Sequence, residues 1–154
     1  MLSLHKSLEF IEKYLEKNAP GIALEKGLSY EGIQKITEKL PFELPLEIYE
    51  LYMWRNGGCL EIIPISYLSV EINCEVIQSF FPLNKSIQIA KEWNNGWFPL
   101  FDSDGVIFWI IGTQNKQKTT PIFCNDEFIL PNEPCFQSLT EMMAKIVEGV
   151  KTIT

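Results

Sequence analysis

Residues 44–58 read LPLEIYELYMWRNGG, and this stretch decides the fold. Pro45 suits the first turn of a helix, where its missing N–H costs nothing and its fixed φ helps. The apolar residues at positions 44, 48, 51 and 52 follow the spacing of one helical face. Asn56 and Gly57 can adopt positive φ and end the helix. The stretch therefore predicts a helix over residues 45–55 that turns directly into a strand over residues 59–63.

A second stretch, residues 93–105, reads WNNGWFPLFDSDG and predicts an aromatic strand that enters a tight acidic turn. The pattern Asp-x-Asp-Gly favours a tight turn between two strands. It also resembles the nucleophile motif of haloacid-dehalogenase-like phosphatases, in which the first Asp attacks phosphorus beside a magnesium ion. Too little chain follows Gly105 for the βα units of such a site. A calcium loop is excluded because its twelve-residue ligand spacing and closing Glu are absent.

The remaining pattern predicts an α+β fold, with a mostly antiparallel central sheet packed against N-terminal helices and a C-terminal helix. An apolar stripe at positions 4, 8, 11 and 15 predicts the first helix, and Ser29 can cap the second. Ser138 and Glu141 have the spacing of a capping box for the last helix. Further elements are expected as a helix at 85–93 and strands at 66–72, 98–101, 106–112, 120–124 and 127–130.

Composition is typical of one compact domain over residues 1–154. Apolar residues make up 46% of the chain and charged residues 21%, which is too apolar for a disordered tail. Charged residues interrupt the first apolar stripe, so we expect an amphipathic helix rather than a signal peptide, and a cytoplasmic protein. We also expect Trp54, Trp93, Trp97 and Pro99 to pack together where the helix over 45–55 meets the sheet.

The formal net charge of −7 argues against nucleic acid and anionic membranes as partners, because both attract basic surfaces. Arg55 is the only arginine, and no basic cluster occurs. The charge is compatible with a basic protein partner, since complementary fields speed encounter. Candidate partner-binding residues are the acidic positions beside expected strand ends and turns: Glu61, Glu71, Glu75, Asp102, Asp104, Asp126 and Glu127.

The chain contains no recognisable catalytic or metal-binding set, so we expect no cofactor. The four cysteines, at positions 59, 74, 124 and 135, lack metal-knuckle spacing, and we expect reduced packing thiols. His5 is the only histidine, so a Cys–His pair or a Ser–His–Asp triad would depend on it. Hydrolysis by two carboxylates stays open, because twenty acidic residues always contain some pair.

Three pieces in order carry a family resemblance: LP…NGG at 44–58, W…WFPLF with its acidic turn at 93–105, and FQSLT at 136–140. Their order and spacing resemble the SUKH superfamily, which includes the fungal Smi/Knr cell-wall regulators. The similarity covers roughly residues 28–150, and residues 64–84 match no motif of that family.

The resemblance implies a function in protein binding. Bacterial SUKH proteins are mostly immunity proteins that neutralise a cognate toxin, often a nuclease, whereas fungal relatives act as scaffolds. It therefore implies a non-enzymatic immunity protein that blocks a basic toxin by occlusion. The alternative is an intracellular protein- or ligand-binding adaptor of the Smi/Knr type, and fold-level analogy is the warrant for both.

Overall fold

The computed structural model describes the chain except residues 23, 65–75, 94, 126–132 and 154. Its described strands form one antiparallel sheet in the order β1-β2-β3-β4-β5, so neighbours in sequence are neighbours in space. The strands are β1 (Gly58–Pro64), β2 (Val76–Phe80), β3 (Trp97–Ser103), β4 (Val106–Ile111) and β5 (Phe123–Asn125). The predicted antiparallel sheet is confirmed.

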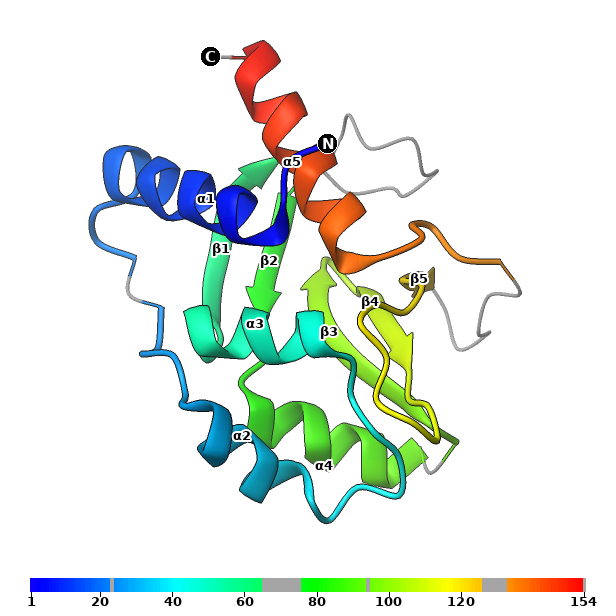
Figure 1. Cartoon of the computed structure of the whole chain (residues 1–154). Helices are drawn as coiled ribbons and strands as arrows, with labels where there is room; N and C mark the ends of the chain where they lie inside the picture. The colour runs from blue at the N-terminus through cyan, green and yellow to red at the C-terminus, as the bar shows by residue number, and fades with distance from the viewer. Residues whose placement is uncertain (23, 65–75, 94, 126–132, 154) are drawn as a thin grey trace.

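Five described helices accompany this sheet: α1 (Leu4–Asn18), α2 (Tyr30–Thr37), α3 (Leu46–Trp54), α4 (Leu83–Trp93) and α5 (Leu139–Ile153). Figure 1 shows α1, α3 and α5 in front of the sheet, with α2 and α4 below them. The core lies between these helices and the sheet, and the α+β prediction is confirmed. No helix in the described part of the chain is long and apolar enough to cross a membrane.

The helix starts follow the capping chemistry that the sequence predicts. The Ser29 hydroxyl accepts a hydrogen bond from the Gly32 N–H at 3.0 Å. At α5 the Ser138 hydroxyl accepts from the Glu141 N–H at 3.0 Å, and the Glu141 carboxylate accepts from the Gln137 N–H at 2.6 Å. The predicted helix over 45–55 is also confirmed, within one residue at each end.

The strands differ from expectation in two places. Strand β2 was not predicted, because VIQSF has no clean alternation of apolar and polar residues. The strand expected at 120–124 starts only at Phe123, since Pro121 lacks an N–H for the ladder. The strands expected at 66–72 and 127–130 lie outside the described residues.

The corner after α3 connects three parts of the fold. Gly57 and Gly58 have φ of 91° and 138°, but Asn56 does not have the positive φ that we expected. Its side-chain oxygen instead accepts a hydrogen bond from the Leu83 N–H at 2.9 Å, at the start of α4. Asn56 and Gly57 also exchange backbone hydrogen bonds with Glu25. The corner therefore sets where α4 begins.

The expected single tryptophan cluster is wrong. Trp54 stacks on Phe80 with ring centroids 6.4 Å apart, on the core side of the sheet. Trp93 and Trp97 instead contact Trp109, at 5.0 and 6.4 Å. Pro99 pairs with Trp109 across β3 and β4. Successive residues of a strand point to opposite faces, so these side chains lie on the face away from the core.

The expectation of four reduced thiols is wrong for one pair, because Cys124 and Cys135 form a disulfide. An isolated antiparallel bridge between Ile122 and Phe136 brings the two segments together. The resulting Cα–Cα distance of 6.3 Å lies in the normal range for a disulfide. Sequence spacing alone gave no sign of this bridge. Cys59 carries a free, half-buried thiol.

Candidate functional site

The acidic turn between β3 and β4 is a two-residue hairpin. Asp104 and Gly105 have φ of 52° and 90°, as a type I′ turn requires. The Asp102 carboxylate accepts a hydrogen bond from the Gly105 N–H at 3.0 Å. The turn interpretation is therefore confirmed, and an antiparallel hairpin replaces the parallel α/β site that a phosphatase needs.

The predicted acidic residues fall into two groups. Glu61 is exposed on β1, Asp104 is exposed at the hairpin, and Asp102 is half-buried. Glu71, Glu75, Asp126 and Glu127 lie outside the described residues. Next to the hairpin the Ser103 hydroxyl donates to the Val76 carbonyl, so the hairpin lies beside the start of β2.

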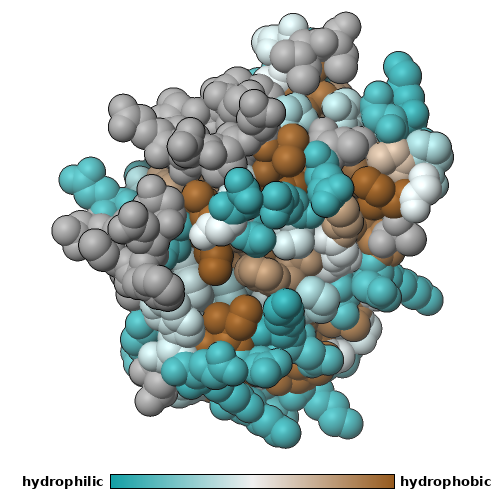
Figure 2. All heavy atoms as spheres, turned by 180° about the vertical axis from the view of Figure 1, so that it is seen from behind, coloured by the Kyte–Doolittle hydropathy of each residue, from teal (hydrophilic) through white to brown (hydrophobic). Residues whose placement is uncertain are grey.

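The face of the sheet away from the core presents a continuous row of side chains. The strand register aligns one half-buried residue from each strand: Cys59, Ser79, Asp102, Ile107 and Asn125. Seen from behind, the molecule shows apolar patches between hydrophilic side chains (Figure 2). A surface of mixed polar and apolar character is typical of protein–protein interfaces. Sequence reasoning missed this row because register across five strands cannot be read from composition.

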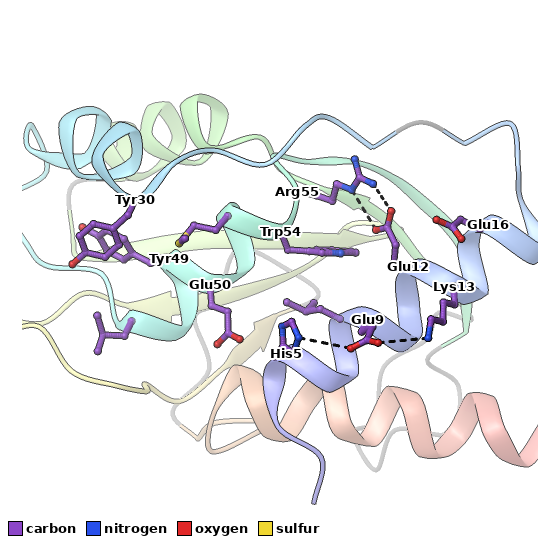
Figure 3. A pocket seen from close by; sticks show the side chains of 13 residues that line it. His5, Glu9, Glu12, Lys13, Glu16, Tyr30, Tyr49, Glu50, Trp54 and Arg55 are labelled. Atoms are coloured by element: carbon purple, nitrogen blue, oxygen red, sulfur yellow. Dashed lines mark hydrogen bonds and ion pairs between the residues drawn. The ribbon is translucent and has the colours of Figure 1, made fainter.

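A second surface, which the sequence analysis also missed, is a groove of about 740 Å³ between α1 and α3. Glu9, Glu12 and Glu16 line it from α1, and Glu50, Met53 and Trp54 line it from α3, as Figure 3 shows for the labelled residues. We call it the α1–α3 groove. The spacing of three and four residues on both helices could have shown these two faces, but not that they face each other.

Ion pairs connect several charges along this groove. The Arg55 guanidinium binds the Glu12 carboxylate, with its Nε donating at 3.3 Å, and this hydrogen bond raises the pKa of Arg55. Glu9 lies 3.5 Å from Lys13 and 3.7 Å from His5. The dashed lines in Figure 3 mark these contacts along α1. Among the described residues, no ion pair or side-chain hydrogen bond engages the Glu50 carboxylate.

The groove ends at two tyrosines. The rings of Tyr30 and Tyr49 lie 4.9 Å apart. The Lys116 ammonium lies 4.3 Å from the centre of the Tyr49 ring, a cation–π contact. The aromatic end of the groove thus already holds one cation of the chain itself.

Glu47 is a buried carboxylate, and such groups often mark functional sites. Here it is structural. Its oxygens accept hydrogen bonds from the backbone N–H groups of Thr120, Leu139 and Thr140 at 3.0–3.3 Å and from the Thr140 hydroxyl at 3.1 Å. Burial raises its pKa, and these donors oppose the rise. With every donor supplied by its own fold, this carboxylate is not free for chemistry.

The described residues bring together no three His, Cys, Asp or Glu side chains that could hold a metal ion. The fold and surfaces define an α+β protein built on one antiparallel sheet, with a half-buried row of side chains across one sheet face and a helical groove. The chain belongs to the SMI1 / KNR4 family (SUKH-1), whose model matches residues 27–145. This family includes immunity proteins and is generally non-enzymatic. No curated protein matches the chain.

Proposed function

We propose that this protein is a non-enzymatic immunity protein of the cytoplasm, which binds a basic bacterial toxin and blocks its active site by occlusion. Family membership supports the class. The observation that carries the binding mode is the acidic hairpin between β3 and β4, which lies where these strands end beside a sheet face of mixed polar and apolar character. The toxin contributes the chemistry, and this chain contributes shape and negative charge.

Occlusion needs a rigid surface more than a reactive one. The hairpin is held by the Asp102–Gly105 hydrogen bond and by the side-chain contact from Ser103 to Val76. On the same sheet, the Trp109 indole N–H donates to the Asn125 side chain at 2.6 Å and holds it in place. A surface fixed in this way loses little conformational entropy on binding. A standard interface of about 1,600 Å² would cover the hairpin and much of the sheet face.

Charge should act mainly on the association rate. Glu61 and Asp104 are exposed, so they keep a hydration shell until contact and contribute long-range attraction. Such steering weakens as salt is added, because the screening length falls to about 8 Å at physiological ionic strength. Dissociation depends more on the buried centre of the interface.

The test is surface-binding kinetics, over a salt series, against the product of any toxin gene that lies beside this one. We expect the Glu61→Gln/Asp104→Asn double variant to slow association several-fold and to leave dissociation almost unchanged. Asn keeps the hairpin because it tolerates positive φ. The matched control is Glu38→Gln/Glu148→Gln, which removes the same charge from two exposed positions, one just after α2 and one on α5.

Two results would change the proposal. Tight binding with an association rate that does not change with salt concentration would contradict electrostatic steering and leave the immunity role intact. No binding at any salt would contradict the immunity role and favour the adaptor function.

A further inference from the structure

We infer that the α1–α3 groove is a second binding surface, which receives a basic amphipathic helix from a protein partner. The inference does not rest on the immunity role. One wall of the groove, α1, lies outside the span that matches the family, so the family match does not account for the groove.

The shape of the groove suits a helix. Both walls are helical faces, and the volume of about 740 Å³ lies along them rather than in an enclosed cavity. An amphipathic helix binds such a groove by inserting apolar residues spaced three, four and seven apart. A small molecule is the poorer fit, because small-molecule sites bury most of their ligand's surface.

The apolar anchors lie on α3. Leu46 and Met53 are 41% and 48% exposed, which is unusual for large apolar side chains in this protein. They are seven residues apart, about two helical turns, and both line the groove. Trp54 lies between the two helices in Figure 3, and its indole nitrogen is buried without a hydrogen-bond partner among the described residues. These side chains offer contact area that the folded chain itself does not cover.

The charge of the groove selects a basic partner. Four glutamates line it, at positions 9, 12, 16 and 50, against Lys13 and Arg55, which leaves a net negative wall when His5 is neutral. Lys13 and Arg55 are already paired with Glu9 and Glu12. Glu50 projects from α3 toward α1 without a paired cation (Figure 3). A second copy of this chain is disfavoured as the occupant, because each copy carries a net charge of −7.

The probe is a synthetic 18-residue peptide with Leu at helical i, i+3, i+4, i+7 spacing and Lys elsewhere. Isothermal titration with the full chain should give saturable one-to-one binding. A peptide with Glu in place of Lys should not bind, and a scrambled Lys/Leu peptide without helical spacing should bind at least tenfold more weakly. Equal binding of the scrambled peptide would overturn the helical occupant.

Variants locate the site. Glu50→Lys should weaken the Lys/Leu peptide at least tenfold, and Met53→Ser several-fold, because one removes the free carboxylate and the other an apolar anchor. Glu38→Lys makes the same charge change at an exposed position just after α2 and should leave binding unchanged. Equal weakening by Glu50→Lys and Glu38→Lys, or none by either, would show non-specific attraction and overturn the proposal. Circular dichroism of each variant confirms that it is folded.

Discussion

Replacing Glu47 by Gln should lower the free energy of unfolding by about 2–4 kcal/mol, because both carboxyl oxygens of this buried side chain accept hydrogen bonds, whereas the N–H₂ group of an amide cannot accept. The Glu47 carboxylate connects the first turn of α3 to the first turn of α5, through the N–H groups of Leu139 and Thr140. It also accepts from the Thr120 N–H, while its own backbone N–H donates to the Lys118 carbonyl at 3.1 Å. The amide of Gln would direct an N–H₂ group at one set of these donors.

The pH dependence of this effect has a definite sign. Burial raises the pKa of Glu47 above the value of the unfolded chain. The stability that this shift contributes is fully present below the unfolded pKa and is lost as pH rises through the folded pKa. The difference in stability between the parent and Glu47→Gln should therefore be largest in acid and shrink as pH rises toward neutrality.

Urea denaturation at several pH values measures both predictions. The matched control is Glu50→Gln, on the same helix, where no side-chain hydrogen bond within the described residues is lost and a change within about 0.5 kcal/mol is expected. Equal midpoints for Glu47→Gln and Glu50→Gln would contradict the structural role of Glu47. A difference that grows with rising pH would contradict the direction of the pKa shift.

The sequence predicted the inner face of α3 well but not its other sides. The apolar residues at positions 44, 48, 51 and 52 are all buried, as their spacing predicts. Yet Glu47 is buried and Leu46 is exposed, the reverse of what residue type suggests. The partners of Glu47 come from residues more than seventy positions away along the chain. No local pattern can indicate a hydrogen bond whose donor is brought to the acceptor only by tertiary packing.

The candidate surfaces likewise combine a part that local sequence predicts with a part that depends on tertiary packing. The hairpin at Asp104 and Gly105 was predictable, because turn geometry depends on a few neighbouring residues. The pairing of Asp102 with Ile107 follows from this hairpin, but the further alignment with Ser79 and Cys59 was not predictable, since register between strands that are distant in sequence depends on tertiary packing and the β1–β2 ladder shifts between Cys59 and Ile63. One inserted residue moves every later side chain to the opposite face.

Replacing Gly57 by Ala should destabilise the fold by about 3 kcal/mol or more, through two separate effects. Its φ of 91° is unfavourable for any residue with a Cβ. A Cβ there would also lie 2.6 Å from the backbone nitrogen of Pro82, closer than real Cβ atoms approach. Moving Pro82 would pull Leu83 away from the Asn56 side chain, which accepts its N–H at the start of α4.

Gly105→Ala separates these two effects. Gly105 has nearly the same φ, 90°, but nothing lies within 4 Å of a Cβ at that position. Its replacement should therefore cost only the conformational term, about 1–2 kcal/mol. Urea denaturation of both variants measures the two losses in free energy of unfolding, provided that the slope of this free energy against urea concentration is unchanged. The difference between the two losses is the energy of the contact with Pro82. If both substitutions lower the free energy of unfolding equally, the backbone at Pro82 can shift without a measurable cost. The close approach of Gly57 then does not hold the start of α4. A larger loss at Gly57 would show that a residue of the NGG corner fixes the start of α4 through its close contact with Pro82.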